Sequence, residues 1–175
     1  MKHTLAILVE NRFGELARIV GLFSARGYNI ESLTVAETLE PQLSRVTLVT
    51  SGDDQTVEQI VKQLKKQIRV QSVIDLTVRA HIEREMALIH VGATAGPQRQ
   101  EVLSLVNVFR AKVVDISEAG LTVEATGNRH KVNELLRLLG PYGIHEIARA
   151  GTLAIGRLPA GNISGEEVER EMAGV

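Results

Sequence analysis

The sequence predicts an α+β fold of two tandem ferredoxin-like modules, each with the element order β-α-β-β-α-β. Short apolar runs of strand length alternate with segments in which apolar residues recur at the spacing of a helix face. Gly, Pro, Asn and Asp separate these segments, as turns require. The whole order occurs twice within 175 residues, a length that suits two small domains.

The first module is predicted over residues 1–78, and its first strand is the apolar run over residues 4–10. Residues 11–14 supply turn chemistry, and Gly27 stands where a glycine commonly ends a helix. Between them, apolar residues recur at i, i+3, i+4 and i+7, which predicts one buried helix face. The members of this face are Leu16, Ile19, Val20 and Phe23.

Three strands and a second helix complete the first module. Residues 28–37 and 45–50 are rich in strand-forming residues, and a turn at residues 40–42 joins them. Residues 51–54 contain turn and N-cap residues before the second helix. Residues 68–78 read as the last strand, because apolar and polar residues alternate near its end. The apolar face of the second helix consists of Val57, Ile60, Val61 and Leu64.

The second module is predicted over residues 86–157, after a charged linker at residues 79–85. It repeats the element order of the first module without close sequence identity. Residues 158–175 are expected to form a tail that is mobile or weakly helical. The predicted elements are a strand over residues 86–91, a helix over 97–109, strands over 112–116 and 121–126, a helix capped by Asn128, and a strand over 144–155.

Composition excludes several classes of function. The net charge is −1, aromatic residues make up only 3% and Trp is absent, so we expect no binding of nucleic acid. The absence of Cys excludes disulfides, thiolate nucleophiles and Cys-ligated metal. The apolar run over residues 4–10 is too short for a signal sequence or a membrane span. We therefore expect a soluble, cytoplasmic protein that makes no membrane contact.

No catalytic or metal-binding motif is found in the sequence. The five His residues show no i, i+4 pair and no HxH, which argues against a metal site within one segment and leaves open one assembled from distant segments. Phosphate-binding glycine motifs and GxSxG are absent. The neighbouring carboxylates Asp53 and Asp54 are explained by helix capping.

The junction over residues 11–16 is the most unusual segment. A strand that turns directly into a helix presents free backbone N–H groups, which favour a carboxylate or another anion. Gly14 lets a ligand approach the backbone, and Asn11 offers an amide for binding. The alternative is that Asn11 caps the helix, Gly14 permits the turn, and nothing binds. A second polar position, Asn29, has turn chemistry as its ordinary explanation.

At this junction the sequence resembles the ACT domain, and more narrowly the small regulatory subunit family of acetolactate synthase. The motif Asn-x-x-Gly-x-Leu over residues 11–16 is moderately specific for ACT domains. The stretch RGYNIESLTV over residues 26–35 is much more specific for the small-subunit family. The resemblance extends through REMALI at residues 84–89, AKVVD at 111–115 and GTLAI at 151–155, so it covers nearly the whole chain.

The resemblance implies a non-catalytic regulatory subunit that activates a catalytic large subunit and confers feedback inhibition by valine in branched-chain amino acid biosynthesis. The family's catalytic subunit uses thiamine diphosphate, Mg²⁺ and usually FAD, and none of these cofactors is expected in this chain. A free-standing ACT sensor acting on another enzyme or on transcription remains the alternative. An ACT sensor of that kind need not have the second module.

The resemblance also implies a homodimer through the ACT domains, with each effector site joining the first loop of one copy to the second strand of the other. No second valine site is expected in the loop over residues 92–96, because it lacks the Asn-x-x-Gly motif. The predicted valine-binding residues are Asn11, Arg12, Phe13, Gly14, Glu15, Leu16, Asn29, Ile30 and Ala36.

Overall fold

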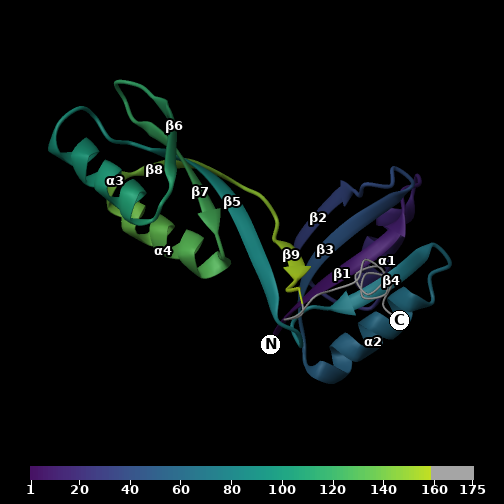
Figure 1. The fold of residues 1–175 in the computed structure, drawn as a ribbon. Coiled ribbons are helices and arrows are strands. Elements are labelled where there is room, and N and C mark those ends of the chain that lie inside the picture. The colour runs from purple at the N-terminus through teal and green to yellow at the C-terminus, as the bar shows by residue number, and fades with distance from the viewer. Residues whose placement is uncertain (159–175) are drawn as a thin grey trace. The chain divides into compact units, whose positions relative to one another are not determined.

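The computed structural model describes residues 1–158, which form two compact units (Figure 1). Unit 1 comprises Met1–Ile82 together with residues 152–158, and unit 2 comprises Glu83–Gly151. Each unit has the predicted β-α-β-β-α-β order, so the fold class is confirmed. The elements of unit 1 are β1 (Lys2–Glu10), α1 (Glu15–Ala25), β2 (Ile30–Glu37), β3 (Leu43–Ser51), α2 (Asp54–Lys65), β4 (Val70–Asp75) and β9 (Leu153–Gly156).

The sheet of unit 1 has the strand order β2-β3-β1-β4, with every neighbouring pair antiparallel. Leu5 of β1 lies opposite Leu48 of β3, and Ile7 lies opposite both Val46 of β3 and Val73 of β4. Because side chains alternate along a strand, these residues share one face of the sheet. Strand β2 lies at one edge, with no neighbour beyond it among the described residues.

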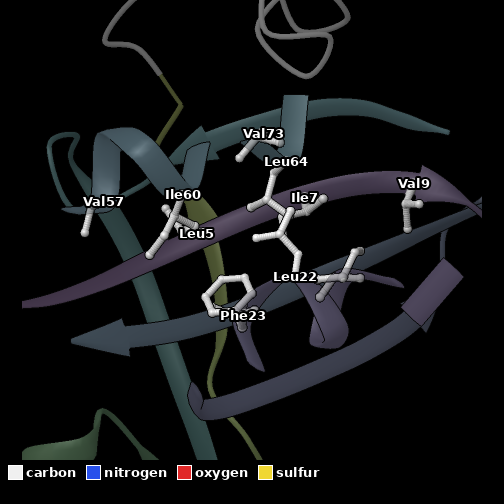
Figure 2. Packing of buried hydrophobic residues seen from close by; sticks show 12 residues of the cluster. Leu5, Ile7, Val9, Leu22, Phe23, Val57, Ile60, Leu64 and Val73 are labelled. Atoms are coloured by element: carbon white, nitrogen blue, oxygen red, sulfur yellow. The ribbon is translucent and has the colours of Figure 1, made fainter. Parts of the chain in front are cut away.

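Both helices of unit 1 pack on this apolar face (Figure 2). The α1 face differs from the predicted one, since Leu22 is buried whereas Leu16 is 40% exposed. The reason is that Glu15 faces the interior, where it forms an ion pair with Arg69. Ile19, one helical turn later, faces the same side. Leu16 is one residue further round the helix than Glu15 and points outward. The residues of this core are Leu5, Ile7, Val9, Ile19, Leu22, Phe23, Val46, Leu48, Val57, Ile60, Leu64 and Val73.

Two of the helices are capped as the sequence predicts. The Oδ1 of Asp53 accepts a hydrogen bond from the N–H of Thr56 at 2.7 Å, and the Oδ1 of Asn128 accepts from the N–H of Lys131 at 2.9 Å. Hydrogen bonding from Thr56 lowers the pKa of the Asp53 carboxyl below its ordinary value. These bonds satisfy backbone donors that a helix leaves without partners in its first turn.

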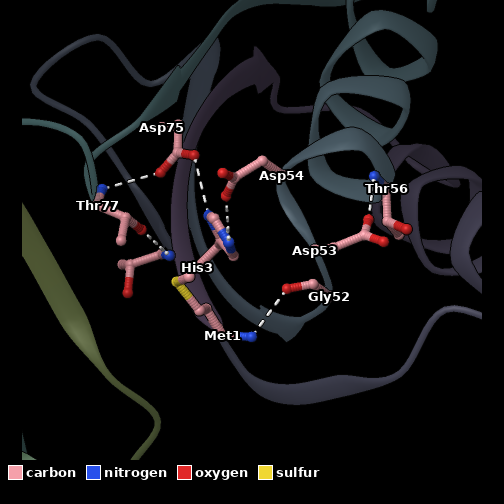
Figure 3. A network of polar contacts seen from close by, with 9 residues as sticks. Met1, His3, Gly52, Asp53, Asp54, Thr56, Asp75 and Thr77 are labelled. Carbon is pink, nitrogen blue, oxygen red and sulfur yellow. Dashed lines mark hydrogen bonds and ion pairs between the residues drawn. The ribbon is translucent and has the colours of Figure 1, made fainter.

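A polar network fastens the start of β1 to α2 and β4 (Figure 3). His3 is buried, with its Nδ1 3.2 Å from the Oδ2 of Asp75 and its Nε2 3.7 Å from the Oδ1 of Asp54. The amino group of Met1 donates to the carbonyl of Gly52 at 2.9 Å. The strand that leads to the candidate site is thus held at its far end.

Unit 2 repeats the plan with the sheet order β6-β7-β5-β8. Helices α3 and α4 supply Val102, Val106, Val132, Leu135 and Leu139 to its core. This confirms the predicted second module. Its elements are β5 (His81–Val91), α3 (Pro97–Val108), β6 (Lys112–Ile116), β7 (Leu121–Gly127), α4 (Arg129–Leu139), a 3₁₀ turn (Gly140–Tyr142) and β8 (Ile144–Arg149).

The domain boundaries differ from the expected ones in two places. The expected linker at residues 79–85 is largely strand, because β5 begins at His81. The expected strand over residues 144–155 is two strands, β8 in unit 2 and β9 in unit 1. The physical reason is that β9 covers apolar surface on unit 1, as described next. Apart from Leu158, the expected tail at residues 158–175 lies outside the described residues.

Residues 152–158, here named the return segment, cover part of the sheet face opposite the helices of unit 1. Ala154 is buried in a small cluster with Ala6, Ile74 and Leu76. Its carbonyl accepts a hydrogen bond from the Nη2 of Arg45 at 3.0 Å, and burial of this guanidinium lowers the pKa of Arg45. A ferredoxin-like sheet with both helices on one side leaves the other face exposed, and here the return segment covers part of that face.

Candidate functional site

The candidate site is the turn between β1 and α1. Gly14 is the N-cap of α1 and has a φ of +89°. This left-handed conformation suits glycine because a Cβ would be strained there. No side chain caps the helix, in contrast to α2 and α4. The first turn of α1 therefore has no side-chain acceptor of its own, which leaves it suited to an external anion.

The space around Gly14 is open. A Cβ built at this position would meet no atom within 4 Å. The backbone at this turn is therefore not covered by neighbouring atoms of the described chain.

Asn11 does not cap α1, which corrects one reading of the sequence. Its Nδ2 donates to the Oε1 of Glu37 at 2.9 Å and to the carbonyl of Pro41 at 3.0 Å. Its backbone N–H donates to the carbonyl of Gln42 at 2.7 Å. Asn11 is thus tied to the end of β2 and to the turn before β3. Sequence reasoning did not select Glu37 as a site residue, because no local pattern pairs it with Asn11.

Ion pairs of two glutamates stabilise the turn between β1 and α1. Glu15 is 4% exposed, and its Oε1 lies 3.0 Å from the Nη1 of Arg18 and 2.8 Å from the Nη1 of Arg69. Glu10 pairs with the Nε of Arg12 at 2.9 Å. Arg69 directly precedes β4, so its ion pair with Glu15 connects the turn to the beginning of β4. Of the predicted site residues, Glu15 therefore has a structural role, which its sequence position alone does not indicate.

Apolar side chains beside this turn are exposed. Phe13 is fully solvent-exposed, and Leu16 is 40% exposed. The turn therefore combines a helix end without a side-chain cap and exposed apolar side chains.

The three predicted strand residues lie at two different ends of β2. Ala36 is exposed near the end of β2 that contacts Asn11. Asn29 and Ile30 lie at the beginning of β2, where the carbonyl of Asn29 accepts from the Oγ1 of Thr50 at 2.6 Å. Six residues of extended chain span about 20 Å. Within one chain, then, Asn29 and Ile30 are too far from the turn for one amino acid to reach both.

The corresponding turn of unit 2 is built differently. The Nε of Arg99 donates to the carbonyl of Ala93 at 3.0 Å, so an internal side chain binds this turn. A cavity of about 230 Å³ lies at the same end of the unit 2 sheet, and its polar lining includes His90, Asp115 and His145.

Within residues 1–158, no cluster of His, Asp or Glu has the arrangement of a metal site. No helix in this range is long and apolar enough to span a membrane.

Comparison with known proteins assigns the family. A family model described as "AHAS small subunit-like ACT domain" matches residues 5–72, and one described as "Small subunit of acetolactate synthase" matches residues 84–158. The acetolactate synthase small subunit of Mycobacterium bovis is 50% identical over 91% of this chain and 94% of its own length. The probable acetolactate synthase small subunit of Archaeoglobus fulgidus is 48% identical over 90% of this chain and 98% of its own length.

A solved structure agrees with the sequence matches. The crystal structure of the acetolactate synthase small subunit from Thermotoga maritima superposes with a TM-score of 0.84 at 40% identity, and the match covers 91% of this chain and 99% of that one. Both sequence modules and the whole fold are shared with these proteins. The chain therefore belongs to the acetolactate synthase small-subunit family.

Proposed function

We propose that this chain is a non-catalytic regulatory subunit that activates the catalytic subunit of acetolactate synthase and inhibits it when valine binds. The observation that supports this proposal is the N-terminus of α1 at Gly14, which no side chain caps and which follows Asn11 by three residues. An α-amino acid carries a carboxylate and an ammonium on one carbon, and the turn offers donors and acceptors for both. Thiamine diphosphate, Mg²⁺ and FAD are expected in the catalytic subunit only.

The recognition chemistry follows from the groups in place. The N–H of Glu15 donates to the carbonyl of Arg12 at 3.3 Å, so the next N–H groups of the first turn of α1 bind the carboxylate, because the helix dipole favours an anion there. Oxygens near Asn11 and Asn29 bind the ammonium. Small apolar residues of β2, among them Ile30 and Ala36, receive the isopropyl group. A methylene more or less in such a pocket changes the binding free energy by about 1–3 kcal/mol, so valine is preferred but leucine and isoleucine compete.

Two copies of the chain complete the site. Strand β2 is an edge strand among residues 1–158, and it pairs with β2 of a second copy in this proposal. An antiparallel pair of β2 strands brings the beginning of one strand beside the end of the other. Asn29 and Ile30 of the second copy then lie next to the turn of the first copy, which bridges the separation of about 20 Å seen within one chain.

Inhibition requires that valine favour one state of the dimer. Valine bound between two copies stabilises one arrangement of the β2 pair. The catalytic subunit must bind that arrangement differently, because a ligand shifts an equilibrium only through differential affinity. A coupling of about 1–3 kcal/mol gives strong but incomplete inhibition.

The primary test is acetolactate formation by the cognate catalytic subunit, with and without this chain and valine. Stimulation by the chain together with valine-dependent inhibition supports the proposal. Stimulation without inhibition keeps the partner and removes the valine site. No effect of either kind favours a free-standing amino-acid sensor.

Mixed dimers test whether two copies share each site. One copy carries Gly14→Asp in the turn, and the other carries Asn29→Ala on the strand. If sites are shared, a mixed dimer keeps one of its two sites with both halves intact. Random exchange of equal amounts makes about half of the dimers mixed, so about a quarter of the wild-type valine binding returns on mixing. If each site lies within one copy, mixing restores no binding.

A further inference from the structure

We propose that Glu37 is a positioning residue for effector binding, because its carboxylate orients the Asn11 side chain so that Oδ1 accepts a hydrogen bond from the effector's ammonium. This inference rests on the proposed function and adds to it a residue outside the Asn-x-x-Gly motif. Glu37 is the last residue of β2, 26 positions beyond Asn11 in the chain.

The orientation of the Asn11 amide follows from the chemistry of its two neighbours. Its Nδ2 lies 2.9 Å from a carboxylate oxygen of Glu37 and 3.0 Å from the carbonyl oxygen of Pro41. Both oxygens only accept hydrogen bonds, whereas an amide has an NH₂ donor on one side and an oxygen on the other. Rotating the amide by 180° would place Oδ1 of Asn11 against the oxygens of Glu37 and Pro41. These three atoms are all acceptors, and no proton would lie between them. The NH₂ group therefore faces Glu37 and Pro41.

The consequence is that Oδ1 is directed away from the hairpin. Among residues 1–158, no side chain or backbone group donates a hydrogen bond to it. An acceptor in this state binds a donor from outside, and an ammonium is a strong one. In the proposed function, the first turn of α1, which begins after Gly14, donates to the carboxylate of the same ligand.

The position of Glu37 is itself held by the hairpin. Glu37 lies opposite Ser44 of β3, and the N–H of the next residue, Thr38, donates to the carbonyl of Leu43 at 3.0 Å. The backbone on both sides of the carboxylate is thus hydrogen-bonded. A residue on a strand end of this kind orients its neighbour more firmly than one on an open loop.

The test compares Glu37→Ala and Glu37→Gln with wild type in the full-length chain, by calorimetric titration with valine. Glu37→Ala should weaken valine binding about 10-fold, because it removes a hydrogen bond to a charged group. Glu37→Gln should stay within about 3-fold of wild type, because its amide oxygen still accepts from Nδ2 of Asn11. Glu40→Ala is the matched control, since it removes the same charge from the adjacent turn and should leave binding unchanged.

A double-mutant cycle separates positioning from a general structural effect. In the Asn11→Ala background, Glu37→Ala should cause no further loss of affinity, because the side chain that it orients is gone. In the free protein, the side-chain amide proton signals of Asn11 should shift in Glu37→Ala and not in Glu40→Ala. That spectrum needs no ligand and stands apart from the proposed function.

The possible outcomes distinguish the two proposals. A wild-type chain that binds no valine overturns the proposed function. A wild-type chain that binds valine, with Glu37→Ala unchanged or additive with Asn11→Ala, overturns the positioning role. If Glu37→Gln loses as much affinity as Glu37→Ala, the carboxylate contacts the ammonium itself and the positioning role is wrong.

Discussion

The backbone N–H of Thr152 donates to the Oγ of Ser32 at 2.8 Å, although the two residues are 120 positions apart in the chain. Ser32 lies on β2, the edge strand of the candidate site, and Thr152 begins the return segment. The carbonyl of Ala154 is also bonded, by Arg45 of β3. The return segment therefore holds the two strands next to the site from the face that the helices leave uncovered.

The first prediction concerns the packing of the return segment. Ala154 is 6% exposed, whereas its neighbour Ile155 is 60% exposed. Ala154→Phe overfills the cluster around Ala6 and Leu76 and should lower the free energy of unfolding by about 1–3 kcal/mol. Ile155→Phe, the control, should change it by less than about 0.5 kcal/mol. Urea unfolding followed by circular dichroism measures both, and equal effects would show that the segment does not pack on the sheet.

A second prediction concerns charge at the helix end. Gly14→Asp places a carboxylate where the ligand's carboxylate is proposed to bind, and it should abolish valine inhibition while activation of the catalytic subunit survives. Gly14→Ala has the same unfavourable φ but no charge, so it should cost about 1 kcal/mol in stability and keep most of the inhibition. The assay is acetolactate formation against valine concentration. Normal inhibition of Gly14→Asp would remove Gly14 from the site.

The third prediction concerns the buried carboxylate under the turn. Glu15→Ala leaves Arg18 and Arg69 without their shared partner. Removing one member of a fully buried ion pair costs about 3–5 kcal/mol. The side chains of Arg18 and Arg69 are 59% and 33% exposed and keep part of their hydration. We therefore expect Glu15→Ala to lower the free energy of unfolding by about 1–3 kcal/mol. Glu58→Ala removes an exposed pair with Lys62 and should cost about 0.5 kcal/mol or less. Thermal unfolding of the two variants against wild type decides between these values.

The fourth prediction concerns pH. Hydrogen bonding from Thr56 lowers the pKa of Asp53 in the folded state relative to the unfolded state. The stability that it contributes is therefore complete above the unfolded-state pKa and is lost as the pH falls through the folded-state pKa. Asp53→Asn keeps a good N-cap but does not titrate. The melting temperatures of wild type and Asp53→Asn should change relative to each other only in this acid range, with wild type losing more on acidification. A difference that stays constant with pH would contradict the assignment.

The sequence by itself determined the β-α-β-β-α-β order of each module and the family. Spacings such as Val57, Ile60 and Leu64 bury one helix face wherever the helix packs, and the caps Asp53 and Asn128 act within three residues of their partners. The turn with the Asn-x-x-Gly motif was also evident from the sequence. Gly14 has a positive φ, which favours glycine whatever the rest of the chain does. Information of this kind is local, so periodicity and turn chemistry reveal it.

Only the tertiary structure decided which side chains meet across the chain. It divided the expected last strand into β8 and β9, because Ala154 fits against Ala6 and Leu76 of the first unit. In the folded chain, α1 is oriented so that Glu15 forms an ion pair with Arg69. The side chain of Asn11 donates to Glu37 and does not cap α1. These contacts join residues 26 or more positions apart. Their energies depend on how the strands are ordered in the sheet, and no local pattern of residues records that order.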